Sequence, residues 1–87
     1  MHERALMRDV MRRIEELARD EGATRVTRVD VRLGALSHFT PNHFRAHFAD
    51  ASRGTVAEGA LVAATVAGDP AETHASDVFV ESVEVEV

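Results

Sequence analysis

The first three residues, Met1-His2-Glu3, have the types and spacing most suited to metal chemistry. A free α-amine, the next backbone nitrogen and the His2 imidazole can close fused chelate rings on one ion, because they belong to one short segment. Planar sites rich in nitrogen suit Ni(II) or Cu(II) better than Zn(II) or Mg(II). The arrangement requires that nothing be attached ahead of Met1. A histidine at position 2 also occurs by chance, so metal binding and accident are both open on this motif alone.

A second candidate is the pair His43 and His47, which stand four residues apart in a segment expected to be helical. That spacing is typical of a bidentate metal pair. His38 lies just upstream, but no third ligand is identifiable, so surface histidines beside an apolar helix face are the alternative. Neither a catalytic triad nor a phosphate-binding glycine loop is indicated, and the chain is therefore predicted not to be an enzyme.

The length and composition of the chain limit the class of protein to which it can belong. The chain has 87 residues, of which 45% are hydrophobic and 29% charged, as expected for one small globular domain. It lacks a run of about 18 apolar residues and a signal-peptide pattern, so we expect a cytoplasmic protein with no membrane contact. No cysteine is present. Disulfides and thiolate zinc sites are therefore excluded, and any metal must use nitrogen and oxygen donors.

Charge is distributed unevenly along the chain. All ten basic residues are arginines at or before Arg53, and the residues after it include seven acids and no base. The acidic part is either a solvated face or a docking surface for a basic partner. Nucleic acid is not an expected partner, because no basic stripe with interleaved aromatic residues is present.

Two amphipathic helices are expected to position these groups. Residues 3–21 carry one apolar stripe, with Glu3 in the first turn and Gly22 placed to end the helix. The stripe comprises Leu6, Met7, Val10, Met11, Ile14, Leu17 and Ala18. Thr40-Pro41 predicts the start of a second helix that runs to about Ser52. Its buried face should carry Phe44, Phe48 and Ala51.

Three strands are predicted, over residues 24–33, 60–67 and 78–87, with Gly68–Ser76 as a loop. In the first strand Val26 falls out of step with the alternation that follows, so the strand begins late or bulges there. The third strand changes parity near Glu81-Ser82, which predicts a bulge. The expected inward residues are Val29, Val31 and Leu33, then Val62, Ala64 and Val66, then Val78, Val80, Val83, Val85 and Val87.

The resulting order is helix, strand, helix, strand, strand. It predicts a single α+β domain over residues 1–87, with two helices packed on one face of a three-stranded mixed sheet. The first two strands should be parallel through a helical crossover. The last two strands are expected to pair with each other in antiparallel fashion.

Taken together, these segments resemble the HypA/HybF family of hydrogenase nickel metallochaperones. The similarity extends in order over nearly the whole chain. The matching stretches are Met1-His2-Glu3, Gly22-Ala23-Thr24-Arg25-Val26-Thr27, Arg32-Leu33-Gly34-Ala35-Leu36-Ser37, Arg53-Gly54-Thr55-Val56-Ala57-Glu58-Gly59 and Val80-Glu81-Ser82-Val83-Glu84-Val85.

The resemblance implies a nickel site built on His2 and nearby backbone nitrogens, with Glu3 influencing affinity or transfer. The expected metal residues are therefore Met1, His2 and Glu3. It also implies delivery of Ni(II) to a [NiFe]-hydrogenase large-subunit precursor, with a HypB-type GTPase as partner; some relatives also serve urease. Because protons compete for the amine and imidazole donors, nickel affinity should fall steeply towards about pH 6.

One departure from the family pattern is large. The family normally carries a zinc lobe with two C-x-x-C pairs between the second and third strands, where this chain has only Gly68–Asp77. Structural zinc is therefore not expected; natural loss of the lobe and its removal are both open. The alternative function is a lobe-less interaction module of the same fold that binds no metal. A self-associating scaffold, pairing through an exposed sheet edge, is a third alternative.

Overall fold

The computed structural model describes residues 2–69, 71 and 76–87, and only the backbone of His2. The elements in order are α1 (His2–Asp20), β1 (Arg25–Leu33), α2 (Pro41–Ala51), β2 (Leu61–Val66) and β3 (Val78–Glu86). The predicted α+β class and element order are confirmed. Most of the predicted loop at 68–76 falls on positions 70 and 72–75, outside the described residues. In the part of the chain that is described, no helix is long and apolar enough to cross a membrane.

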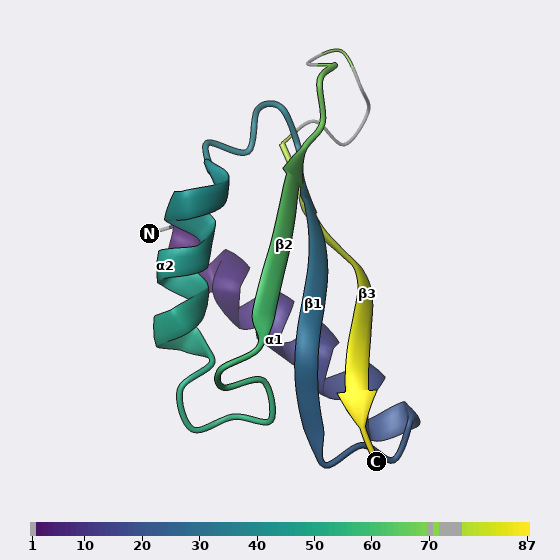
Figure 1. Ribbon diagram of the computed structural model, residues 1–87. Coiled ribbons are helices and arrows are strands. Elements are labelled where there is room, and N and C mark those ends of the chain that lie inside the picture. The colour runs from purple at the N-terminus through teal and green to yellow at the C-terminus, as the bar shows by residue number, and fades with distance from the viewer. Residues whose placement is uncertain (1, 70, 72–75) are drawn as a thin grey trace.

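The sheet is centred on β1, with strand order β2-β1-β3 (Figure 1). β2 runs parallel to β1 and β3 runs antiparallel to it, so the predicted parallel crossover through α2 is confirmed. The prediction that the last two strands pair with each other is wrong, because both pair with β1 instead. β1 contributes the most fully buried apolar side chains of the three strands. In the central position it is covered on its inner face and hydrogen-bonded along both edges.

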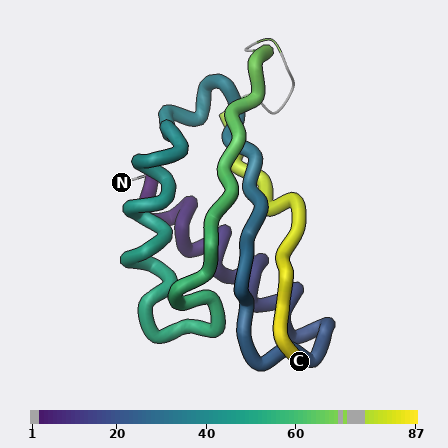
Figure 2. The backbone as a smooth tube through the Cα atoms, in the orientation of Figure 1, coloured from purple at the N-terminus to yellow at the C-terminus, as the bar shows by residue number. Residues whose placement is uncertain are grey.

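Both helices cover the same face of the sheet, as predicted. α1 packs across β3 and β1, and α2 packs beside β2 and against α1. Figure 1 shows α1 passing behind the strands, with its purple start beside α2 and its end near the C-terminus. The tube in Figure 2 shows the same crossing of the two helices. α1 ends at Asp20, two residues before the predicted Gly22, which takes a positive φ of 63° that favours glycine.

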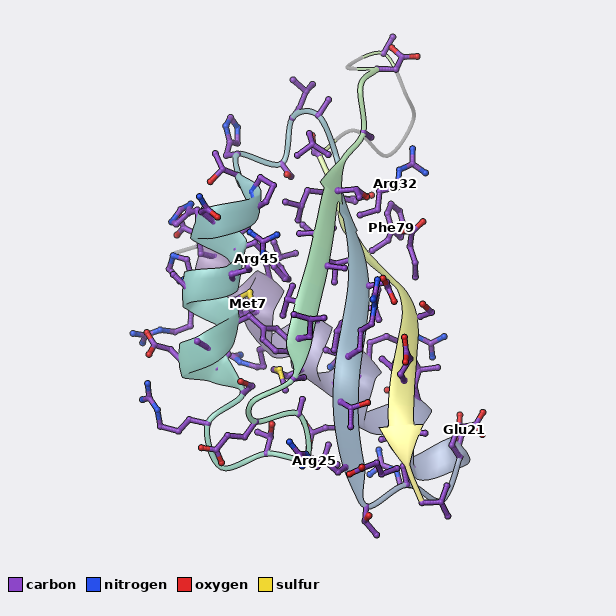
Figure 3. The ribbon with its side chains drawn as sticks, viewed as in Figure 1. Met7, Glu21, Arg25, Arg32, Arg45 and Phe79 are labelled. Carbon is purple, nitrogen blue, oxygen red and sulfur yellow. The ribbon has the colours of Figure 1, made fainter. Side chains whose placement is uncertain are left out.

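The core lies between the helices and the inner face of the sheet. Its completely covered side chains are Ile14, Val26, Val29, Leu33, Phe44 and Ala57, each with 0% exposure. On α1 the buried stripe is turned slightly from the predicted one. Met7 and Met11 are buried, whereas Leu6 and Leu17 are only partly buried. Met7 lies between the helices and the sheet in Figure 3.

Two bulges reconcile the strand patterns with one buried face. Val26 pairs with Val85 and Arg28 pairs with Glu84, which leaves Thr27 as an extra residue in β1. An extra residue reverses the alternation of side chains, so Val26 and the later valines all face the core. The bulged alternative for β1 is therefore confirmed, and the late start is wrong.

The bulge predicted in β3 is also confirmed. Asp30 pairs with Ser82 and Val31 pairs with Val80, so Glu81 is the extra residue. Two residues predicted to face inward do not: Val66 is 51% exposed and Val87 is 88% exposed. Val66 is the last residue of β2, and Val87 lies beyond the end of β3, so neither is covered by a helix.

Basic residues from the first part of the chain form ion pairs with acidic residues from the last part, across the neighbouring strands β1 and β3. An Arg28 nitrogen lies 3.6 Å from a Glu84 carboxylate oxygen, and an Arg25 nitrogen lies 3.9 Å from Glu86. Two acids of β3 are thus matched by arginines of β1. The acid-rich end of the chain therefore does not form a purely acidic face at these positions.

Asp30 is the most closely held carboxylate on this face. The Arg28 guanidinium donates to it at 2.9 Å, and the Ser82 hydroxyl donates to it at 3.1 Å. The hydrogen bond from Arg28, together with that from Ser82, lowers the pKa of Asp30 below its usual value. The ionised form is therefore favoured in the folded chain.

We predict that Phe44→Ala lowers the free energy of unfolding by about 3–5 kcal/mol, because it removes a fully buried ring and leaves a cavity. The measurement is urea unfolding followed by circular dichroism. Leu61→Ala is the control, since Leu61 is 62% exposed, and should change stability far less. Equal losses in the two variants would contradict this description of the core.

We predict that Asp30→Asn destabilises the chain at neutral pH and that this difference shrinks in acid. The folded pKa of Asp30 is lowered, so its contribution is present above the unfolded pKa of about 3.9 and is lost as pH falls through the folded value. Urea midpoints at several pH values between about 7 and 2 measure this. Glu81→Gln is the control, because it also neutralises one carboxylate of the chain. If the stability difference between the unchanged chain and Asp30→Asn stayed constant over that pH range, as compared with this control, the lowered pKa of Asp30 would not be its cause.

Candidate metal centre

The start of α1 carries two of the three predicted metal residues, His2 and Glu3. His2 opens the helix and Glu3 lies exposed in its first turn. Met1 and the side chain of His2 lie outside what the structure describes, so the set Met1, His2 and Glu3 stays a prediction. The first N–H groups of an α-helix have no carbonyl partner within the helix. A metal binding backbone nitrogen here would therefore break no helical hydrogen bond.

Glu3 connects this first turn to the second helix. It lines one groove together with His38 and Phe39, and another together with His47 and Arg8. The pKa of Glu3 lies below its usual value, chiefly because its own backbone N–H donates to the carboxylate, with a smaller contribution from His47. Glu3 of α1 and His47 of α2 therefore line one groove, an arrangement that the sequence did not predict.

The start of α2 is held by two local interactions. The Thr40 hydroxyl accepts a hydrogen bond from the His43 backbone N–H at 3.1 Å, and Pro41 follows as the first helical residue. Phe39 packs edge-on against Phe44, with ring centroids 5.7 Å apart. An apolar residue before the cap packing on the fourth helical residue is a hydrophobic staple. These contacts fix the rotation of α2 and hence the direction of its histidines.

The predicted proximity of His43 and His47 is confirmed. Their Nε2 atoms lie 2.9 Å apart and their ring centroids 4.6 Å apart. The Phe39 ring lies beside both imidazoles, at centroid distances of 5.3 Å to His43 and 6.0 Å to His47. The sequence pattern did not indicate Phe39 as part of the site or of the core. Its place directly before the cap residue was the signal that could have identified it.

His38 does not join this pair in a larger cluster. It takes a positive φ of 66° in the turn after β1 and lines the groove that also contains Glu3. Within the described ranges, no group of three or more histidine, cysteine, aspartate and glutamate side chains is placed to hold a metal ion. The described candidate donors are thus a histidine pair and a nearby carboxylate.

These features define a small α+β domain whose candidate metal donors are nitrogen and oxygen atoms at one end of its helical layer. A family model described as hydrogenase/urease nickel incorporation, metallochaperone, HypA, matches residues 1–85. The chain belongs to the HypA family, as the resemblance indicated. Because this is a family of metallochaperones, the prediction that the chain is not an enzyme is confirmed.

Individual relatives agree with the family match. The chain is 43% identical over 62 residues to hydrogenase maturation factor HypA 1 of Bradyrhizobium diazoefficiens, covering 71% of this chain and 55% of the relative. It is 42% identical over 60 residues to hydrogenase maturation factor HypA of Methylocella silvestris, covering 69% and 53%. The chain thus spans about half the length of the curated relatives that it matches.

A solved structure supports the fold. The solution structure of the Ni metallochaperone HypA from Helicobacter pylori superposes with a TM-score of 0.75, covering 94% of this chain and 95% of that one. The sequence identity is 14%, so this similarity shows the shared fold alone.

Proposed function

We propose that this chain carries Ni(II) at its N-terminus and delivers it during maturation of [NiFe]-hydrogenase. The proposed donors are the α-amine of Met1, a nearby backbone nitrogen and the imidazole of His2, with Glu3 tuning affinity or transfer. The observation that carries the proposal is the sequence Met1-His2-Glu3 in a chain whose residues 1–85 match a nickel-incorporation family.

The structure of α1 supports this use of its first turn. The positive end of the helix dipole disfavours a cation at a helix start, and the ionised Glu3 carboxylate offsets that effect. Glu3 and Arg4 are exposed, so an acceptor protein can approach this end of the helix without unfolding the carrier. Nickel would then move to the acceptor by exchange of ligands.

The proposed partners follow from the family. They are a HypB-type GTPase and the large-subunit precursor of a hydrogenase, with urease as a further client, in the cytoplasm. The chain has no cysteine, so we propose that it acts as a single domain, residues 1–87, without the zinc lobe and without structural zinc. Contacts that a zinc lobe makes in other family members would then be absent.

The alternative, a lobe-less interaction module that binds no metal, is favoured by one surface. β2 is an uncharged edge strand on which Leu61 and Val66 are exposed. Arg45, labelled in Figure 3, reaches from α2 and donates to the Val62 carbonyl at 3.2 Å. This hydrogen bond occupies one backbone carbonyl of the strand. The exposed apolar residues could contact a partner or a second copy of the chain. Under this alternative His2→Ala leaves hydrogenase maturation intact, whereas under the nickel proposal maturation is lost.

The first experiment is a calorimetric Ni(II) titration of the chain with a free amine on Met1. We predict a high-affinity event near one equivalent that is lost in His2→Ala, because the substitution removes the imidazole donor. A version with Gly-Ser-Gly added before Met1 should lose the same event, because Met1 then has no free amine. If this event survived both changes, the proposed N-terminal site would be wrong.

We predict that affinity for this first nickel ion falls at least ~100-fold between about pH 8 and about pH 6. A free α-amine has a pKa near ~7.7–8.0 and an imidazole near ~6.5, so protons compete for both donors, and a bound backbone amide must also lose its proton. Titrations at intermediate pH values measure the change, with circular dichroism confirming that the chain stays folded. Affinity that is flat over this range would contradict the amine-imidazole donor set.

A further inference from the structure

A pair of imidazoles stands on α2, separate from the residues of the proposed N-terminal site. We propose that His43 and His47 form a second, independent metal site that holds a divalent ion between their two Nε2 atoms. The expected ions are Ni(II) and Cu(II) rather than Zn(II). This site uses none of the donors of Met1-His2-Glu3, so it can exist whether or not the N-terminal site does.

The distance between the two nitrogens carries the proposal. The Nε2 atoms are 2.9 Å apart. Two nitrogens bound at about 2.0–2.1 Å to one ion lie roughly 2.8–3.0 Å apart at a right angle, and roughly 3.3–3.4 Å apart in a tetrahedral site. The observed separation therefore matches neighbouring positions of a square-planar or octahedral ion. Square-planar nitrogen sites are typical of Ni(II) and Cu(II).

The orientation of the rings also fits a shared ion. At a nitrogen separation of 2.9 Å, two imidazoles aimed head-on at each other would have centroids farther apart than the 4.6 Å observed. The axes from ring centre to Nε2 are therefore not collinear, and the two ring planes are inclined to each other at 64°. An ion bound in neighbouring positions requires nitrogens that converge at an angle rather than along one line.

The pair is held in place before any ion binds. Residues four apart on a helix project one above the other, and the Thr40 cap and Phe39–Phe44 contact fix the start of this helix. Phe39 is itself buried, with 7% exposure, and its ring lies beside both imidazoles. Less side-chain freedom is then lost on binding, which favours affinity.

Metal binding requires a change of tautomer in this pair and a rotation of the rings that turns both lone pairs towards the ion. In the metal-free chain one Nε2–H donates to the lone pair of the other Nε2, since the two atoms are at hydrogen-bond distance. With an ion bound, both Nε2 lone pairs face the ion and both protons reside on Nδ1. Two neutral imidazoles therefore bind the ion without net loss of a proton.

The surroundings set the expected strength. His43 is exposed and His47 half-buried, so water can fill the remaining coordination positions. Since the described residues supply no third histidine, cysteine or carboxylate ligand in place, we expect weaker binding than at a three-donor chelate. Glu3 and Arg8 line the same groove as His47; the carboxylate favours a cation there, whereas the guanidinium opposes it.

The test uses the full chain with the N-terminal site disabled, that is, with Gly-Ser-Gly before Met1 and His2→Ala. Ni²⁺ is titrated into this parent and into parents that also carry His43→Gln, His47→Gln or His38→Asn. Binding is followed by calorimetry and by broadening of amide signals in nuclear magnetic resonance spectra. Asparagine at 38 is the matched control, because it removes an imidazole and tolerates the positive φ there.

The expected result is about one equivalent of Ni²⁺ bound by the parent and by His38→Asn, with broadening centred on His43 and His47. Changing a neighbour that only orients a ligand costs ~10–100-fold in metal affinity, so losing either direct ligand should cost at least ~10-fold. Unchanged circular dichroism in the glutamine variants shows that lost binding is not lost folding. No binding by the parent, or equal binding by all variants, overturns this site and leaves the N-terminal proposal untouched.

Discussion

The structure depends on burying the inner face of β1 under two helices. Val26, Val29, Val31 and Leu33 are covered almost completely, and this is possible only if α1 and α2 pack on the same side of the sheet. A small domain has only one core, so both apolar helix faces converge on this strand. The convergence has a chemical result: the first turn of α1, with Glu3, comes to lie against the histidine-bearing part of α2.

Because both helices pack on one side of the sheet, its two faces have different roles. The inner face carries the core, and the outer face pairs arginines of β1 with acids of β3. The candidate metal groups lie at neither face but at the end of the helical layer, where α1 begins and α2 is capped. Donors there remain reachable, whereas Phe39 and Phe44 behind the histidines are buried. An accessible site on a rigid support would suit the proposed transfer of a metal ion.

The two proposed metal sites differ in what assembles them. Met1, His2 and Glu3 are consecutive, so their donors can meet on one ion without any tertiary contact. His43 and His47 depend on a helix, on its cap and on the Phe39 ring. The first kind of site can be read from adjacent residues. The second could be suspected from the spacing of its histidines, but the sequence did not indicate its nitrogen separation or the groove that it shares with Glu3.

The sequence by itself determined the elements, their order and the family, because periodicity, caps and turns are local. Even the bulges at Thr27 and Glu81 showed as breaks in alternation, since one extra residue reverses a strand's pattern. Only the tertiary structure decided that β2 and β3 flank β1 instead of pairing with each other, and that Val66 and Val87 are exposed. Strand order and coverage arise from competition among all apolar surfaces for one core. No segment encodes the result of that competition, which also placed Glu3 and His47 in one groove.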